Sequence, residues 1–371
     1  RLSFTTDVAA AIKQSLVIFI AVGTPPQPDG SADLSFVESV AEAIAQHMDS
    51  YKVIATKSTV PVGTGKRLAE IITARQTKPT AFSVVSNPEF LREGAAIGDF
   101  MRPDRVVIGG SDAQAIAIMR DLYRPLYLIE TPFVITSLEG AELIKYAANA
   151  FLATKISFIN EIANLCERVG CDVHEVARAI GMDRRIGSKF LHAGPGFGGS
   201  CFPKDIAALS VIGRQFSSPT QIVDSVIEVN RRQRLSMISK IERLVSSPLS
   251  GKRIAVLGLA FKPETDDMRD APSVDIIKGL VDLGAKVVAF DPVAKIEAEK
   301  VLPMIEYAGN EYDAAMGADV LVFITEWNQF RALDMKRIRA SMSVPRIADL
   351  RNMYNPADMR EMGFEYVGVG R

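Results

Sequence analysis

The chain has 371 residues, 48% of them hydrophobic, which is enough for large apolar cores and suggests two or three domains. Its 43 basic and 44 acidic residues leave a formal charge of -1, which argues against nucleic acid and membrane surfaces as partners but allows a small anionic ligand. Three cysteines are an odd number and too few for a secreted disulfide framework, so we expect a cytoplasmic protein, and three scattered histidines predict no metal site.

The first stretch, residues 1–134, alternates apolar runs of strand length with amphipathic helical patterns. Strands are predicted at "SLVIFIAV", "YKVIATKST" and "FSVVSNP", and helices at "FVESVAEAIAQHM" and "TGKRLAEIITAR". This alternation predicts βαβ units and a parallel sheet. The longest apolar runs, such as 16–23, are far too short for a bilayer-spanning helix, and the opening "RLSFTTDVAAAIK" lacks the apolar region of a signal peptide.

The middle and last stretches have different patterns. Residues 135–248 are almost wholly helical, and 137–170 predict one helix of roughly eight turns that ends at Gly170. A helix of this length is typical of a domain bridge or a subunit interface. In 249–371 the βαβ pattern returns, with strands at "KRIAVLGLAF", "AKVVAFDP" and "ADVLVFIT" and a helix from about Pro272 to Leu283. The segment "SSPLSGK", rich in Ser, Pro and Gly, is the predicted linker.

The stretch "GPGFGGSCFPKD" (194–205) places Cys201 between glycines and a predicted helix start. Pro203 suits the first position of that helix, so the helix dipole and the neighbouring Lys204 favour the thiolate form of Cys201. Asp205 lies on the first helical turn, close enough to act on a group that the sulfur holds, and the glycines let backbone approach a ligand closely. A single cysteine is more often a small buried hydrophobe, but these surroundings favour a chemical role.

Three other polar clusters accompany the cysteine. Lys145 and Asn149 stand four apart on one face of the long helix, either as a solvated pair or, if closely packed, as a proton-exchanging lysine with its neighbour. Glu89 and Glu93 follow a strand in "NPEFLREG", at the sheet edge where α/β proteins bind ligands. Thr59 follows another strand in "STVPVGTG". Each cluster alone is weak evidence for a site.

A dinucleotide fingerprint of the form G-x-G-x-x-G is absent between any predicted strand and helix. The nearest pattern is "VLGLAFKPETDD", in which Gly258 ends a strand and Asp291 ends the next one, while Ala260 and Pro263 occupy the later glycine positions. Gly258 is then a simple turn residue, half of a dinucleotide fingerprint, or part of a site for a phosphate-bearing ligand held by backbone N–H groups and Lys262.

Together, six motifs resemble the UDP-glucose/GDP-mannose dehydrogenase family in order and spacing over essentially the whole chain. They are "KSTVPVGT", "SNPEFLREG", "KYAANAFLATKISFINE", "GMDRRIG", "GFGGSCFPKD" and "GLAFKPETDDMRD". The form "GGSCFPKD" is most similar to the UDP-glucose branch. The resemblance implies an α/β fold of two Rossmann-like parallel-sheet domains joined by a long central helix and helical region. The implied domains are the remainder of an NAD-binding domain (1–134), a dimerisation and catalytic region (135–248) and a UDP-binding domain (249–371).

The resemblance also implies the reaction: an NAD-dependent four-electron oxidation of UDP-glucose to UDP-glucuronate through a thiohemiacetal and a thioester on Cys201. Lys145 and Asp205, with an ordered water, would remove the proton of the C6 hydroxyl, and Glu89 and Asp205 would serve the hydrolytic water. The implied catalytic residues are Cys201, Lys145, Asp205, Asn149, Glu89 and Thr59. The implied assembly is a homodimer or higher homo-oligomer.

Binding residues follow from the same resemblance. The implied substrate-binding residues are Phe90, Leu91, Lys145, Asn149, Arg185, His192, Gly194, Phe197, Gly198, Phe261, Lys262 and Arg351. The implied cofactor-binding residues are Thr24, Thr59, Glu93, Lys204 and Arg269. Family members begin with a strand that carries G-x-G-Y-V-G, which this chain does not contain. We therefore expect an N-terminally incomplete chain without the first βα units, and we assign none of its residues to the NAD pyrophosphate.

Other functions stay open at this stage. GDP-mannose and UDP-N-acetylmannosamine dehydrogenases share the same fold and motifs, so these two nucleotide sugars are alternative substrates. An inactive nucleotide-sugar binding protein would keep "GLAFK" and Arg351 but lose Cys201, Lys145 or Asp205, all of which are present. A thiol-dependent aldehyde dehydrogenase of another fold would lack Lys145 and Asn149 on a long central helix.

Overall fold

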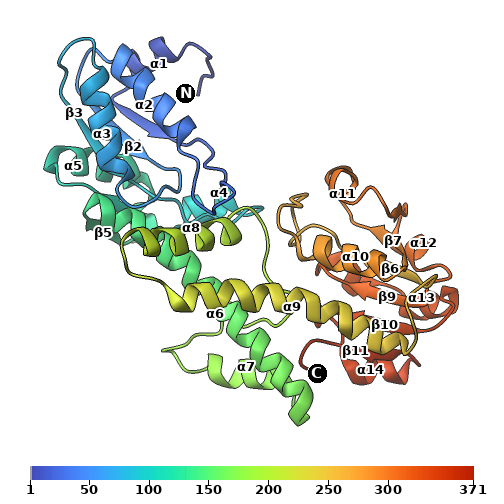
Figure 1. Cartoon of the computed structure of the whole chain (residues 1–371). Coiled ribbons are helices and arrows are strands. Elements are labelled where there is room, and N and C mark those ends of the chain that lie inside the picture. The colour runs from blue at the N-terminus through green and yellow to red at the C-terminus, as the bar shows by residue number, and fades with distance from the viewer. Residues whose placement is uncertain (1, 130) are drawn as a thin grey trace. The chain divides into compact units, whose positions relative to one another are not determined.

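The computed structural model describes residues 2–129 and 131–371, which form two compact units (Figure 1). The first unit contains the chain up to Ala150 together with Lys204–Thr220, and the second contains Phe151–Pro203 together with Gln221–Arg371. Helices α6 (Leu138–Val169) and α8 (Phe202–Gln215) each have residues in both units. Each unit is therefore assembled from two separate pieces of the chain.

A five-stranded sheet in the order β1-β2-β3-β4-β5 forms the centre of the first unit. Its strands are β1 (Val17–Ile20), β2 (Lys52–Thr56), β3 (Phe82–Ser86), β4 (Val106–Gly109) and β5 (Phe133–Thr136). The pairs β1–β2, β2–β3 and β4–β5 are parallel, whereas β3 and β4 meet antiparallel, through Ser86 and Gly109. The predicted parallel arrangement is confirmed for β1, β2 and β3, and β4 reverses the chain direction.

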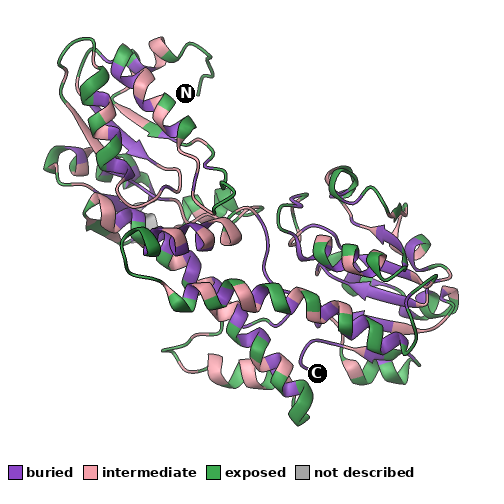
Figure 2. Cartoon of the chain, in the orientation of Figure 1, coloured by how far each residue is buried: buried purple, intermediate pink, exposed green. Residues whose placement is uncertain are grey.

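Helices cover this sheet on both faces. They are α1 (Val8–Gln14), α2 (Ser35–His47), α3 (Thr64–Arg75), α4 (Ala96–Met101) and α5 (Ala113–Tyr123), which a 3-10 helix, Arg124–Ile129, follows. The central strand β2 is buried along its whole length (Figure 2), and its side chains alternate between two cores. Ile54 packs with residues of α2 and α3, whereas Val53 and Ala55 pack with residues of α5.

The second unit contains a six-stranded sheet in the order β11-β10-β9-β6-β7-β8, in which all described strand pairs are parallel. Its strands are β6 (Arg253–Leu257), β7 (Lys286–Phe290), β8 (Glu306–Tyr307), β9 (Val320–Phe323), β10 (Arg346–Asp349) and β11 (Glu365–Val367). Its other helices are α7 (Val173–Gly181), α9 (Gln221–Val245), α10 (Pro272–Asp282), α11 (Lys295–Val301), α12 (Glu311–Ala315), α13 (Met335–Ser341) and α14 (Pro356–Glu361), with a 3-10 helix at Asn328–Ala332. The predicted return of a parallel α/β pattern is confirmed.

The central strand β6 also supplies two cores. Ile254 and Val256 pack with residues of α6, α9 and α10, whereas Ala255 and Leu257 pack with residues that include Phe330. The central strands β2 and β6 are thus each covered on both faces, as is typical of strands in parallel arrangements. No helix among the described residues combines the length and apolar character that a membrane crossing demands.

Of two predicted helix boundaries, one is confirmed and the other differs by one residue. The long helix α6 agrees with the prediction, but α8 begins at Phe202, so Pro203 stands at its second position and not at its first. Pro203 still causes no loss of a helical hydrogen bond there, because the first-turn N–H groups have no partner within the helix. The segment "SSPLSGK" joins α9 to β6 inside the second unit, with Leu249 buried in the core.

Candidate active site

In the first unit, the loops that follow β1, β2 and β3 meet at the carboxyl edge of the sheet. The Thr24 hydroxyl donates a hydrogen bond of 2.9 Å to the Thr59 carbonyl oxygen, and the Ser58 hydroxyl donates one of 2.6 Å to the Val22 carbonyl oxygen. These bonds join the β1 loop to the β2 loop. The structure therefore brings Thr24 and Thr59 together at the edge where open α/β sheets bind ligands.

Lys145, on the second turn of α6, pairs with Glu89 from the loop after β3. Their Nζ and Oε1 atoms are 3.1 Å apart, and the Lys145 side chain is only 4% exposed. The other carboxylate oxygen of Glu89 accepts a hydrogen bond from the Leu91 N–H, and the Lys145 ammonium lies 5.5 Å from the centre of the Phe90 ring. The long-helix lysine is thus closely packed and paired, and the solvated alternative is wrong.

Asp205 is the second carboxylate of this region and is 1% exposed. Its Oδ2 accepts a hydrogen bond of 2.6 Å from the Asn149 side-chain amide, and its Oδ1 accepts one of 2.7 Å from the Lys204 ammonium. A buried carboxylate needs such partners to keep its charge. Lys145 and Asn149 project from the same face of α6, so one helix supports both carboxylates of the predicted catalytic set.

Lys57 is a polar residue here that the sequence analysis missed. Its ammonium donates to the Asn87 side-chain oxygen (3.3 Å) and to the Tyr123 hydroxyl (3.1 Å). Burial lowers the pKa of Lys57 to about 8, opposed by the Glu89 carboxylate and aided by the Lys145 ammonium. These electrostatic couplings put Lys57 beside the Lys145–Glu89 pair. Only its position directly after a buried strand could have pointed to it.

Glu142 is a second missed residue. It projects from α6 to the start of α3, where its two carboxylate oxygens accept hydrogen bonds of 2.7 Å from the Gly63 and Gly65 N–H groups. Burial raises the pKa of Glu142 to about 7, although both N–H donors oppose the rise. The N–H groups at the start of α3 therefore bind the Glu142 carboxylate. These two bonds also fix the loop that carries Thr59 to α6.

In the second unit, Cys201 is exposed and directly precedes α8. Its sulfur lies 3.6 Å from the Ser200 hydroxyl. The next residue, Phe202, contacts the aromatic rings of Phe190 and Phe197, at centroid distances of 6.2 Å and 6.0 Å. The predicted placement of the thiol at a helix start is confirmed, and these rings anchor the chain beside it.

The glycine-rich loop before Cys201 is held by amide side chains of α6 and α9. Asn160 accepts from the Gly194 N–H (2.9 Å), Gln233 donates to the Gly194 carbonyl (2.8 Å), and Asn230 bonds both backbone groups of Phe197. The loop is therefore a rigid segment of the second unit. No sequence motif linked these three amides to the loop.

Two glycines of this loop are required by the chain itself. A Cβ on Gly198 would stand 2.2 Å from the Asp270 carbonyl oxygen, and one on Gly199 would stand 2.6 Å from the Phe261 ring. The Gly199 N–H also donates to the Arg269 carbonyl (2.9 Å). These glycines let the loop approach the segment after β6, which explains their presence without a ligand.

Phe261 and Arg351 are brought together in the second unit. The Arg351 guanidinium donates to the Phe261 carbonyl (3.2 Å) and the Ile324 carbonyl (2.8 Å), and it pairs with Glu326 at 3.0 Å. The Lys262 ammonium lies 5.2 Å from the centre of the Phe261 ring. Four predicted residues, Gly198, Phe261, Lys262 and Arg351, therefore lie around the segment after β6.

Of the three alternatives left open for Gly258, the structure supports the simple turn residue and contradicts a phosphate held by the N–H groups that follow it. Asp291 is buried, and its Oδ2 accepts hydrogen bonds from the Leu259 N–H (2.7 Å), the Ala260 N–H (3.2 Å) and the indole N–H of Trp327 (3.2 Å). The Leu259 and Ala260 N–H groups are therefore already bonded to a carboxylate of the chain. Asp291 is thus a structural anion of the turn, and it is unavailable as the ribose acid of a fingerprint.

The remaining predicted residues are more peripheral within their units. Arg185 is exposed and pairs with Asp183 at 2.6 Å, and Arg269 is exposed and makes a two-bond pair with Asp267. His192 is exposed at the start of the glycine-rich loop, and Glu93 is half-buried in the loop after β3. Their predicted roles in binding remain predictions.

Comparison with known proteins gives matches along most of the chain. Residues 1–127 match the NAD binding domain of the UDP-glucose/GDP-mannose dehydrogenase family, residues 139–232 match its central domain, and residues 255–356 match its UDP binding domain.

Individual relatives agree with this family. The UDP-glucose 6-dehydrogenase of Rhizobium meliloti (strain 1021) is 52% identical over 375 residues, which cover 100% of this chain and 85% of the relative. A UDP-glucose 6-dehydrogenase of Bacillus subtilis (strain 168) is 48% identical, with 100% of this chain and 80% of the relative covered. The solved UDP-glucose dehydrogenase of Pyrobaculum islandicum is 38% identical, with a TM-score of 0.91 over 100% of this chain and 83% of that one. The chain therefore belongs to the UDP-glucose/GDP-mannose dehydrogenase family and is an NAD-dependent enzyme.

Proposed function

We propose that this enzyme oxidises UDP-glucose to UDP-glucuronate in two steps at one cysteine, as the names of its relatives suggest for the sugar. One observation carries the mechanism. An exposed thiol, Cys201, directly precedes α8, and the first turn of that helix carries the buried Asp205 with its Asn149 and Lys204 partners. A nucleophile and a supported carboxylate thus stand four residues apart in the chain.

The first sheet suits the cofactor. Its carboxyl edge carries the joined Thr24 and Thr59 loops, and the buried Thr56 hydroxyl at the end of β2 has no hydrogen-bond partner within the described residues. Thr24, Thr59, Glu93, Lys204 and Arg269 are the residues that we propose to hold NAD. Bound there, NAD⁺ supplies the electron acceptor for each of the two oxidations.

In the first oxidation, Lys145 and Asp205 remove the C6 hydroxyl proton with an ordered water between them. The close packing of Lys145 and the burial of Asp205 keep both groups at fixed positions, which general acid–base catalysis needs. Asn149 orients Asp205 through its amide and, with Lys145, stabilises the developing oxyanion. Thr59 assists from the loop after β2.

Cys201 then captures the aldehyde as a thiohemiacetal, which becomes a thioester in the second oxidation. The helix α8 starts one residue later, so its first N–H groups point toward the end that carries Cys201. Glu89 and Asp205 direct the water that hydrolyses the thioester. Covalent capture keeps the reactive aldehyde on the enzyme.

The substrate-binding residues that we propose are the ones that the family resemblance implies. They are Phe90, Leu91, Lys145, Asn149, Arg185, His192, Gly194, Phe197, Gly198, Phe261, Lys262 and Arg351. Lys262 and Arg351 stand in the region that matches the family's UDP binding domain, which supports a role with the nucleotide.

The decisive experiment replaces the thiol. Cys201→Ser is expected to bind UDP-glucose but to form uronate at least about a thousandfold more slowly, because a serine hydroxyl is a far weaker nucleophile at neutral pH. NADH and UDP-glucuronate formed per UDP-glucose would be quantified together. The matched control is Cys171→Ser, since Cys171 is also exposed but lies at the end of α6. Normal turnover by Cys201→Ser would refute the covalent mechanism, and equal turnover of GDP-mannose would refute the choice of sugar.

We also propose that the enzyme is a cytoplasmic homodimer or higher homo-oligomer. In α6, the residues Phe151, Phe158 and Leu165 recur every seven positions and are 65%, 49% and 54% exposed. Such a stripe is typical of a helix that packs on another helix. Phe158→Ser is expected to shift sedimentation toward monomer, whereas Phe216→Ser, an exposed phenylalanine outside the stripe, is expected to leave the assembly unchanged. No shift with Phe158→Ser would exclude this interface.

A further inference from the structure

The end of α6 brings two cysteines together. The helix ends at Val169, and Gly170 follows with φ of 79°. The carbonyl oxygen of Cys166 accepts hydrogen bonds from the Gly170 N–H (2.9 Å) and from the Cys171 N–H (3.1 Å). This backbone pattern is a Schellman-type helix end, in which the side chains of the two outer residues come into contact. Here those residues are Cys166 and Cys171.

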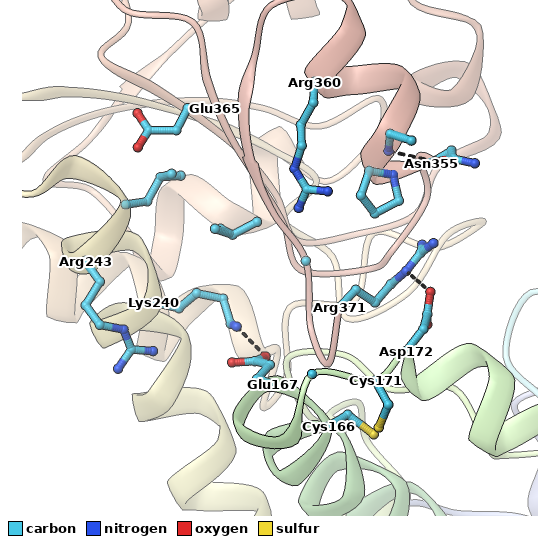
Figure 3. Close-up of a pocket in the computed structure, with 16 residues that line it drawn as sticks. Cys166, Glu167, Cys171, Asp172, Lys240, Arg243, Asn355, Arg360, Glu365 and Arg371 are labelled. Atoms are coloured by element: carbon cyan, nitrogen blue, oxygen red, sulfur yellow. Dashed lines mark hydrogen bonds and ion pairs between the residues drawn. The ribbon is translucent and has the colours of Figure 1, made fainter.

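The two thiols are in contact but differ in exposure. Figure 3 shows the Cys166 and Cys171 sulfur atoms side by side at the end of α6. Cys166 is 2% exposed and packs in the core of the second unit, whereas Cys171 is exposed. Burial and then the adjacent Cys171 raise the pKa of the Cys166 thiol to about 11. Cys171 is therefore the thiol that a reagent reaches, and Cys166 is the thiol behind it.

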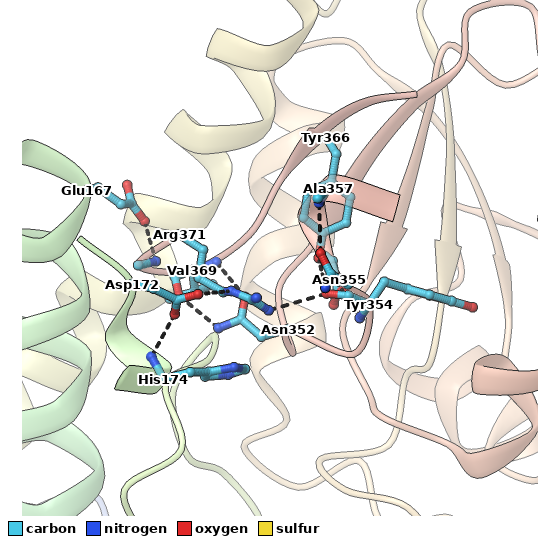
Figure 4. Close-up of polar contacts among 12 residues, drawn as sticks. Glu167, Asp172, His174, Asn352, Tyr354, Asn355, Ala357, Tyr366, Val369 and Arg371 are labelled. Atoms are coloured by element: carbon cyan, nitrogen blue, oxygen red, sulfur yellow. Dashed lines mark hydrogen bonds and ion pairs between the residues drawn. The ribbon is translucent and has the colours of Figure 1, made fainter. Parts of the chain in front are cut away.

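The segment that carries Cys171 is fixed on its other side. Asp172 caps α7 by accepting from the His174 N–H (2.7 Å), and it also accepts from the Arg371 guanidinium (2.9 Å), as Figure 4 shows. The Val173 N–H donates to the Gly370 carbonyl (2.9 Å), and the Gly370 N–H donates to Glu167 (2.8 Å). Cys171 is thus held against Cys166 by contacts on both sides.

Space for a reagent is available beside the thiols. Both cysteines line a hollow of about 830 Å³. Its charged lining residues are Lys240, Arg243, Arg360 and Arg371 on the positive side and Glu167, Asp172 and Glu365 on the negative side. The small positive excess favours an anionic small molecule over a cationic one.

We propose that Cys166 and Cys171 form a reversible intramolecular disulfide when the enzyme meets a small-molecule disulfide. The Cys171 thiolate attacks one sulfur of the oxidant, whose S–S bond breaks and releases one thiolate. Cys166 then loses its proton and attacks the Cys171 sulfur, which releases the second half of the oxidant as a thiolate. The two cysteine thiols lose two electrons and two protons, and the oxidant is reduced to two thiols. The site is separate from Cys201 and independent of the proposed reaction.

The test uses the whole chain with the third thiol removed, as Cys201→Ser. This protein is incubated with oxidised glutathione, quenched with iodoacetamide under denaturing conditions, and analysed by intact mass and peptide mapping. We expect the loss of two hydrogen atoms, no alkylated cysteine, and a linked Cys166–Cys171 peptide that dithiothreitol reverses. The double variant Cys171→Ser/Cys201→Ser is expected to remain reduced at Cys166.

Each other outcome overturns the proposal. A persistent glutathione adduct on Cys171 would mean that Cys166 does not resolve it. A Cys171-linked dimer of chains would show that the two thiols are not each other's nearest partners, and full alkylation of both thiols would show that no oxidation occurs. Cys166→Ala/Cys201→Ser serves as a second variant, because alanine fills the buried position without a polar atom. It is expected to trap the glutathione adduct on Cys171.

Discussion

The two sheets of this enzyme end in opposite ways at their carboxyl edges. In the first unit, the groups that follow β2 and β3 are Lys57 and Glu89, which lie beside Lys145. In the second unit, the corresponding carboxylate, Asp291, accepts hydrogen bonds from four backbone N–H groups and the Trp327 indole. The same strand-end position thus carries charged side chains that lie beside Lys145 in one sheet and a carboxylate that holds a turn in the other.

This contrast predicts that equivalent acidic substitutions have different consequences. In the first unit the carboxylate is expected to matter for turnover, and in the second unit for stability. Acidic residues of the two units can therefore be compared by measuring turnover and the free energy of unfolding for each variant.

The largest effect is expected from Asp205→Asn. The amide keeps the shape of the carboxylate but cannot accept a proton, and it leaves the Lys204 ammonium without its negative partner. Turnover is expected to fall by about 10³-fold, within the range for a lost general base, while the KM for UDP-glucose changes much less. Steady-state NADH formation measures both constants. Turnover within tenfold of the unaltered enzyme would remove Asp205 from the proposed base system.

Asp291→Ala is expected to act on folding. It leaves five donors without their acceptor, namely the N–H groups of Leu259, Ala260, Val293 and Ala294 and the Trp327 indole. The free energy of unfolding is expected to fall by about 5 kcal/mol, at about 1 kcal/mol for each donor. Denaturant titration followed by tryptophan fluorescence reports it directly, because Trp327 is the only tryptophan. The exposed Asp282→Ala is the control, and an equal loss in both variants would contradict the structural role of Asp291.

Lys57→Met is expected to give a smaller, pH-dependent effect. Burial sets the pKa of Lys57 to about 8 in the folded protein, below its ordinary value, so between these two values the unfolded chain binds more protons than the folded one. Unaltered protein should therefore gain roughly 2 kcal/mol of stability relative to Lys57→Met between about pH 7 and about pH 9.5. Denaturant titrations at the two pH values measure the difference. Exposed Lys78→Met should show no such gain, and a flat difference for Lys57→Met would contradict a strongly desolvated ammonium.

Sequence patterns predicted the features that depend on neighbouring residues. The strands β2 and β6, the extent of α6 and the position of Cys201 before a helix all follow from local apolar runs, periodicity and turn chemistry. The Lys145 and Asn149 face was also predicted, because residues four apart share one side of a helix.

Features that depend on distant residues were missed or misread. Glu142 bonds to N–H groups 77 and 79 positions away, and the burial of Lys57 depends on Tyr123, 66 positions away. The role of Asp291 stayed open because a strand-ending acid gives the same sequence pattern whether it binds a ribose or the turn 32 residues earlier. The reversal of β4 likewise has no local pattern, since it depends on which strand it meets.

The interleaving of the two units has a consequence for synthesis on the ribosome. All residues of the first unit have been made once Thr220 has been added, whereas the second unit needs residues up to Arg371. Glu167 and Asp172 bond to Gly370 and Arg371, which lie 203 and 199 positions later. Loop closure over such separations is slow, and domains generally fold as units during translation. The first unit can therefore fold before the second, whose part of α6 and whose Cys201 segment gain all their contacts only after Gly370 and Arg371 have been made.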